Sequence, residues 1–213
     1  MKILNTFTLK MIAIISMLID HVGYIFFPSV MMFRIIGRLA FPIFAYVLAE
    51  GFVYTRDVKK YLLRLGLFAL LSEIPYDLAI MGNVLEFSHQ NVFFTLFFGV
   101  LMLYAMSRMQ NMLMQYAVVL VAVFVCRFLH TDYSSIGVLL VFIFYIFRQR
   151  TVEKLLIAGF IFLGLTGGLQ LYALLALPLI ALHNGEQGPK MKAFFYLFYP
   201  AHLLILYLVH LMV

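Results

Sequence analysis

Long apolar segments occupy this 213-residue chain almost from end to end, and only short polar stretches separate them. Most of these segments approach the roughly 20 apolar residues that a helix needs to cross a bilayer. Only 11% of the residues are charged, whereas a soluble domain carries roughly 25%. The pattern excludes a soluble globular enzyme, a disordered chain and a secreted disulfide scaffold. It predicts an integral protein of the inner (cytoplasmic) membrane.

The apolar segments predict an all-α, polytopic bundle of about nine membrane helices (eight to ten), which takes up residues 1–213 as a single domain. The segments at 152–165 and 169–182 are short, and they are expected to be two thin spans or one re-entrant pair. The expected spans are 8–27, 33–54, 60–80, 91–107, 112–129, 133–147, 152–165, 169–182 and 193–213.

Basic residues are concentrated on one side of the predicted topology. With the N-terminus in the cytoplasm, twelve of the 15 lysines and arginines fall on the inner side, and Arg34, Arg38 and Arg127 fall on the outer side. This asymmetry sets the orientation of membrane proteins, and it supports an odd number of spans. It also accounts for the net charge of +6, so no nucleic-acid partner is expected.

A set of polar residues lies at one depth in the outer half of the predicted bundle. Charges inside a span are costly, and they mark functional sites or internal ion pairs. The helical rise places His21 roughly 20 Å up the first span, and the other members reach a similar level. We therefore predict a buried polar cavity open to the outer face. Its candidate residues are Asp20, His21, Arg34, Arg38, Glu73, Asp77, His89, Asn91, Asp132 and Tyr133.

Two interpretations of this set remain open. In the functional one, Asp20 fixes the tautomer of the adjacent His21 so that the imidazole can transfer a proton near neutral pH. In the structural one, Asp20 or Glu73 pairs with Arg38 and locks the bundle. Pro42 frees the carbonyl of Arg38, four residues earlier, and is expected to kink the second span there.

A second polar group lies nearer the cytoplasmic side. Glu50 is near the inner end of the second span, and His202 is about halfway along the last. The Gly-rich loop 183–190, with Asn184 and Lys190, and Lys192 beyond it, has the composition of a phosphate-binding turn. An ordinary turn with topology-setting lysines explains it equally well. No metal is expected, because no two histidines have the i, i+4 spacing of a helical zinc site and Cys126 is the only cysteine.

The order of these motifs resembles the TraX family of membrane proteins, and the resemblance runs through nearly the whole chain. Its strongest part is the Ile-Asp-His-Val-Gly run at 19–23, followed by the Arg-rich stretch at 34–44. The segments that carry the resemblance are 19–23, 34–44, 50–52, 61–64, 72–77, 91–95, 132–133, 137–139, 145–148, 184–185 and 194–204.

The resemblance implies an acetylation activity. The founding TraX protein is associated with N-terminal acetylation of conjugative pilin, and the family is similar to larger transmembrane acyltransferases. By that likeness His21 is the catalytic base, Arg38 stabilises a carbonyl or a phosphate, and acyl-CoA is the donor on the cytoplasmic side. This chain is shorter than those larger relatives.

The leading hypothesis is a membrane acyltransferase that moves an acetyl group from acetyl-CoA to an amine or hydroxyl of a pilin-like peptide or small acceptor. Asp20, His21 and Arg38 form its catalytic set. The acceptor pocket is assigned Arg34, Glu73, Asp77, His89, Asn91, Asp132 and Tyr133, and the donor site Glu50, Asn184, Lys190, Lys192 and His202. The alternatives are a proton-coupled transporter and a non-enzymatic partner of a conjugation or secretion assembly. The sequence does not predict the oligomeric state.

Overall fold

Helices make up about three-quarters of residues 2–212, the part of the chain that the computed structural model describes. These residues form no β-strand, only two isolated bridges, so the prediction of an all-α protein is confirmed. The elements are α1 (Thr6–Phe26), α2 (Met31–Gly37), α3 (Ala40–Tyr54), α4 (Val58–Tyr76), the π-helical turn η1 (Asp77–Met81), α5 (Val92–Met106), α6 (Met112–Phe128), α7 (Ser134–Ile146), α8 (Thr151–Leu165), the 3₁₀-helix η2 (Gly168–Leu175), α9 (Ala176–Ala181) and α10 (Lys192–His210).

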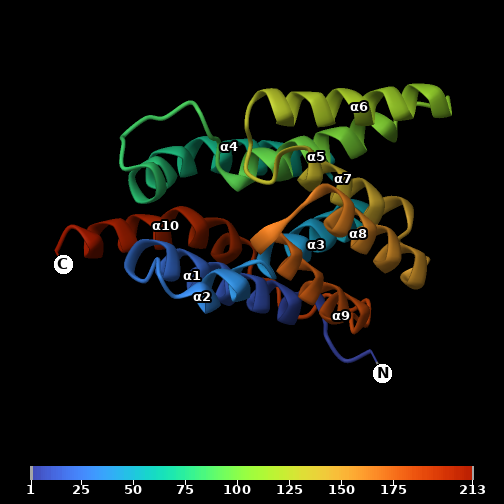
Figure 1. Ribbon diagram of the computed structural model, residues 1–213. Helices are drawn as coiled ribbons and strands as arrows, with labels where there is room; N and C mark the ends of the chain where they lie inside the picture. The colour runs from blue at the N-terminus through green and yellow to red at the C-terminus, as the bar shows by residue number, and fades with distance from the viewer. Residues whose placement is uncertain (1, 213) are drawn as a thin grey trace.

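The helix α3 is the centre of the bundle. Ten of its 15 residues are buried, because it packs against α1, α5, α7 and α9. A helix that is apolar all round fits such a central place. Around it, α1, α2 and α10 lie on one side and α4, α5 and α6 on the other, and the two termini lie at opposite ends of the molecule (Figure 1).

The outer surface of the bundle is apolar, as expected for a protein surrounded by lipid. On α6 and α8, the large exposed side chains include Leu120, Phe124 and Phe160. Among residues 2–212, three helical segments are long and apolar enough to cross a membrane: Thr6–Phe26, the α2–α3 stretch Met31–Tyr54, and Lys192–His210. The other apolar helices are shorter, so nine spans and a cytoplasmic N-terminus stay predictions.

Two prolines coincide with breaks in the helices. The expected second span divides at Arg38 and Leu39, between α2 and α3, where Pro42 cannot bond the carbonyl of Arg38. The expected third span is α4 followed by η1, and Pro75 lies inside α4 just before this π turn. The kink predicted at Pro42 is thereby confirmed, and it places Arg38 at a break in the helix.

Helices α1 and α2 approach each other closely through two glycines. A Cβ atom on Gly23 would lie 2.1 Å from Cβ of Phe33, and one on Gly37 would lie 2.2 Å from Cβ and Oδ1 of Asp20. No side chain fits in either place. The glycines therefore bring α2, and with it the two arginines, directly against Asp20 on α1.

Candidate functional site

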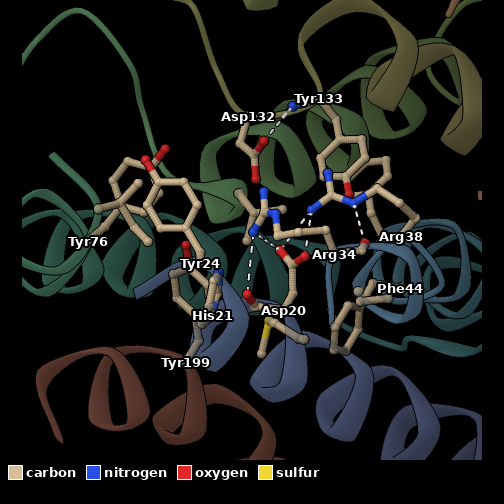
Figure 2. Close-up of a pocket in the computed structure, with 16 residues that line it drawn as sticks. Asp20, His21, Tyr24, Arg34, Arg38, Phe44, Tyr76, Asp132, Tyr133 and Tyr199 are labelled. Carbon is tan, nitrogen blue, oxygen red and sulfur yellow. Dashed lines mark hydrogen bonds and ion pairs between the residues drawn. The ribbon is translucent and has the colours of Figure 1, made fainter. Parts of the chain in front are cut away.

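A cavity of about 160 Å³ opens where α1, the α2–α3 break, α4, α10 and the loop before α7 meet. We call it the His21 cavity. Figure 2 shows Arg34 and Arg38 pointing toward Asp20 within it. The polar residues that line it are Asp20, His21, Tyr24, Arg34, Arg38, Tyr76, Asp132, Tyr133 and Tyr199. Six of them were predicted from the sequence to meet at one depth, and the structure brings these six together.

Asp20 forms ion pairs with two arginines at once. Its Oδ2 lies 2.9 Å from Nη1 of Arg34 and 2.7 Å from Nη2 of Arg38, which also lies 2.9 Å from Oδ1. Nε of Arg38 donates to the backbone carbonyl of Arg34 at 3.2 Å. One carboxylate thus meets two guanidinium groups, which leaves the cluster with a net positive charge. Asp132 also lines the cavity, but forms no direct ion pair within residues 2–212.

The loop before α7 closes the cavity on the side opposite α1. Tyr133 stacks on Phe41 of α3, with ring centroids 3.8 Å apart and planes 9° apart. His130, Tyr133 and Ser134 all have positive φ angles, a costly conformation for residues with side chains that often occurs at functional sites. Thr95 of α5 holds the loop through bonds to Thr131 and to the carbonyl of Asp132.

His21 contacts a second histidine, on α10. Its Nδ1 lies 2.7 Å from Nε2 of His202, and the rings stack with centroids 5.0 Å apart. Nδ1 of His202 lies 2.7 Å from the backbone carbonyl of Phe198. We call this chain of three groups the histidine relay. Within residues 2–212, Nε2 of His21 has no hydrogen-bond partner.

The expected contact between Asp20 and His21 does not form in this structure. Asp20 faces the arginines, and His21 faces α10. Neighbouring residues on a helix point about 100° apart and do not face each other. The two side chains therefore serve different clusters, although both line the His21 cavity. The alternative interpretation, in which Asp20 pairs with Arg38, agrees with the geometry.

Four residues assigned to the acceptor pocket lie outside the lining of the His21 cavity. Asn91 is fully buried, donates to Glu73 and to the carbonyl of Ala69 at 2.8 Å, and caps α5. Asp77 accepts from the backbone N–H of Glu86 at 2.8 Å and so holds the loop after η1. His89 is exposed in that loop beside His130. The contacts of Glu73, Asn91 and Asp77 hold the bundle and this loop together.

A second cavity, of about 170 Å³, lies at the end of the bundle that contains the N-terminus. We call it the Lys154 cavity. Of the residues assigned to the donor site, Glu50 and Asn184 line it, whereas Lys190 and Lys192 are exposed outside its lining and His202 belongs to the histidine relay. Its other polar members include Lys2, Tyr46, Arg148, Lys154 and His183.

His183, in the loop after α9, joins three parts of the fold. Its Nε2 lies 3.1 Å from Oγ1 of Thr6, and its Nδ1 lies 2.8 Å from the hydroxyl of Tyr46. Burial lowers the pKa of His183 below its usual value, because removing the imidazolium from water is costly. The neutral ring therefore links the start of α1, the centre of α3 and the loop.

The sequence interpretation missed several members of both cavities. His202 was assigned to the donor site rather than to His21, and Lys154 was counted only among topology-setting lysines. Depth along the helices could have paired His202 with His21, since both lie far from the inner ends of their spans. Nothing in the local sequence marks Lys154 as buried.

No three His, Cys, Asp or Glu side chains of the described residues are grouped as metal ligands.

The chain is similar in sequence to one protein family and to two named proteins. The sequence model described as "TraX protein" matches residues 6–210. The chain is 27% identical to the "Probable fimbrial assembly protein FimC, serogroup H1" of Dichelobacter nodosus, over 95% of this chain and 94% of that protein. It is 30% identical to the "Uncharacterized protein RP591" of Rickettsia prowazekii (strain Madrid E), over 36% of this chain and 31% of that protein. No solved structure matches the chain.

Proposed function

The chain belongs to the TraX family, and on this basis we propose that it is an acyltransferase of the cytoplasmic membrane. It moves an acetyl group from acetyl-CoA to an amine or hydroxyl acceptor. His21 is the base, Arg38 stabilises the developing negative charge, and His202 orients His21. The observation that carries the proposal is the histidine relay, because it prepares one nitrogen of His21 to accept a proton.

The hydrogen-bond directions in the relay follow from its last member. The carbonyl of Phe198 can only accept, so Nδ1 of His202 carries a hydrogen. In the neutral ring, Nε2 of His202 is then an acceptor, and Nδ1 of His21 donates to it. Nε2 of His21 keeps its lone pair. This is the arrangement that a triad gives to its catalytic histidine, with a second imidazole and a carbonyl in place of the carboxylate.

The transfer step uses this lone pair. Nε2 of His21 takes the proton of the acceptor N–H or O–H while the acceptor atom attacks the thioester carbonyl carbon. The carbon–sulfur bond then breaks, and the thiolate leaves with the proton that His21 carried. While His21 is protonated, its hydrogen bond to His202, which in turn bonds the carbonyl of Phe198, stabilises the positive charge.

The arginines supply the electrostatic part of the mechanism. Attack on the thioester makes an oxyanion, and fixed positive groups in a site with little water stabilise such a charge strongly. Asp20 balances only one of the two arginines and holds both in place. Nη1 of Arg38 has no hydrogen-bond partner within residues 2–212, so it is the donor we assign to the oxyanion.

A pilin-like peptide is the acceptor that the name of one relative favours. The similar protein of Dichelobacter nodosus is named for fimbrial assembly, and the N-terminus of a pilus subunit is an amine of the kind that His21 can deprotonate. Arg34, Asp132 and Tyr133 line the His21 cavity where this amine would enter. The acyl group and the amine would then meet at His21.

The test is transfer of labelled acetyl groups by the purified full-length protein. Membranes or detergent micelles containing the protein are incubated with radiolabelled acetyl-CoA and with peptides bearing a pilin-like free N-terminus. We expect labelled peptide from the unchanged protein and none above background from His21→Gln. His210→Gln is the matched control, because His210 is exposed at the end of α10.

Other results would favour a different function. Wild-type transfer by His21→Gln contradicts the proposal. Absence of acetyl-CoA consumption, together with pilus assembly that tolerates His21→Gln, supports a non-enzymatic assembly partner, which the name of the fimbrial relative favours. Proton-coupled uptake of a solute in proteoliposomes, abolished by His21→Gln, supports a carrier.

A further inference from the structure

The Lys154 cavity contains more positive than negative charge. Lys2, Arg148 and Lys154 line it, and Glu50 is its one acidic side chain among the residues described. None of the three cations forms a direct ion pair within residues 2–212. The lining therefore has a formal excess of two positive charges, in a cavity with room for a small anion.

Lys154 is the buried member of this group. Its residue surface is only 3% exposed. Its ammonium group lies 3.5 Å from the carbonyl of Arg148 and 4.7 Å from the ring centre of Tyr46. A buried ammonium group without a carboxylate partner is costly. The cost is offset when an anion enters the cavity and bonds the ammonium group.

The backbone holds this cavity in shape. The carbonyl of Leu4 accepts from Asn184 N–H at 2.8 Å, and Ile3 N–H donates to Leu182 at 2.9 Å. These bonds fix the segment that carries Lys2 against the loop after α9. His183 lies in the same loop and bonds both Thr6 and Tyr46. Three separate parts of the chain thus meet around Lys154.

We propose that the Lys154 cavity binds a phosphate group, with Lys154 as its buried partner and Arg148 and Lys2 at its mouth. Phosphate is the common anion that matches two or more cations in a small polar cavity. It can come from a phosphorylated acyl donor or from a lipid headgroup. Only the first source rests on the proposed function.

The distance between the two cavities is compatible with a donor that reaches both. Thr6 contacts His183 beside the Lys154 cavity, and His21 lies 15 residues further along α1, which is about 22 Å of helix. A long flexible arm, such as the pantetheine of coenzyme A, could cover much of this distance. A headgroup phosphate would remain at the Lys154 cavity alone.

Binding to the purified full-length protein tests the proposal. The probes are coenzyme A, inorganic pyrophosphate, and nanodiscs of phosphatidylcholine with or without phosphatidic acid. We expect Lys154→Gln to weaken binding of the preferred probe at least about tenfold, the usual loss for a charge-assisted bond, and Arg148→Gln to weaken it less. Lys154→Arg should retain most of the affinity. The exposed Lys190→Gln and Lys192→Gln are matched controls.

The outcomes separate the sources and the two proposals. Coenzyme A binding that pyrophosphate displaces assigns the cavity to the donor, whereas binding of phosphatidic acid alone assigns it to a lipid. Pyrophosphate is too short to reach His21, so its binding reports on the Lys154 cavity alone and is measured separately from acetyl transfer. Arg148 is exposed, so its variant is expected to fold even where Lys154→Gln does not. Wild-type affinity in both variants, or equal losses in the Lys190 and Lys192 controls, overturns the proposal.

Discussion

Nδ1 of His21 and Nε2 of His202 lie 2.7 Å apart although 181 positions separate them in the sequence. The bond joins α1 near the start of the chain to α10 near its end. A second bond at 2.7 Å continues from His202 to the carbonyl of Phe198. The base of the proposed reaction thus depends on a residue from the opposite end of the chain.

The first prediction concerns His202 as a positioning residue. In His202→Gln the relay loses its second imidazole, so the tautomer and the orientation of His21 are no longer fixed. We expect kcat for acetyl transfer to fall about 100-fold, with KM for acetyl-CoA changed little. The pH at which transfer is half-maximal should also shift, because His21 is the titrating base. Steady-state kinetics across the pH range measure both effects.

The matched control for His202→Gln is His210→Gln. His210 is exposed and lies about two turns further along the same helix. His210→Gln should transfer acetyl groups like the unchanged protein. If His202→Gln lowered only the amount of folded protein, the transfer rate per folded molecule and its pH profile would match those of the unchanged protein. That result would make His202 a purely structural residue.

The second prediction concerns the charge of Asp20. In Asp20→Asn, Arg34 and Arg38 lose the carboxylate with which both form direct ion pairs. Removing one partner of a buried ion pair costs about 3 kcal/mol, so the thermal unfolding midpoint in detergent should fall clearly. Asp57→Asn is the control, because Asp57 pairs with Lys60 on the surface and asparagine also caps a helix. Equal midpoints for the two variants would contradict the prediction.

The sequence predicted well at which level along the helices the polar residues lie, but it predicted poorly which way their side chains point. The rise along the helices placed Asp20 and Arg38 at one level, the topology placed the loop of Asp132 on the same side, and all three residues line the His21 cavity. Pro42 likewise predicted the break at Arg38. These features follow from distance along the chain and from the missing N–H of proline.

Rotation about each helix axis was not predictable in the same way. A helix that is apolar on every face gives no pattern that shows which side meets its neighbours. Glu73 and Asn91 were assigned to the acceptor pocket, but they bond each other and lie outside the lining of the His21 cavity. Lys154 was missed for a different reason, since a basic residue at the start of a helix normally points to water.

The third prediction concerns the close contact of α1 with α2. In Gly37→Ala the new methyl group would occupy the position of the Asp20 side chain, 2.2 Å from its Cβ. The helices must move apart, so the ion pairs lengthen, and the free energy of unfolding should fall by at least about 2 kcal/mol. Acetyl transfer should fall with it. Gly164→Ala is the control, because nothing lies within 4 Å of its added Cβ, and it should unfold at an unchanged or higher temperature.

The fourth prediction separates the bonds of Asn91 from the transfer chemistry. Asn91→Ala removes the cap of α5 and the bonds to Glu73 and to the carbonyl of Ala69. We expect a loss of about 2 kcal/mol in the free energy of unfolding. The rate per folded molecule should stay near that of the unchanged protein, because Asn91 does not line the His21 cavity. A large rise in KM for the acceptor, with the stability unchanged, would instead support the assignment of Asn91 to the acceptor pocket.

The last prediction is a dependence of stability on pH at His183. Burial lowers the pKa of His183 in the folded chain, whereas in the unfolded chain it titrates near its ordinary value of about 6.5. As the pH falls through this value, the unfolded chain takes up a proton that the folded chain does not, so the folded state loses stability.

In His183→Gln this loss cannot occur. The variant lacks the imidazole bonds to Thr6 and Tyr46, so it should be less stable than the unchanged protein at pH 8. The difference between their unfolding midpoints should narrow as the pH falls from about 8 to about 5. Only the unchanged protein has the imidazole of His183, whose pKa burial lowers. A difference at His183 that stays constant over this range would mean that its imidazole titrates alike in the folded and unfolded chains.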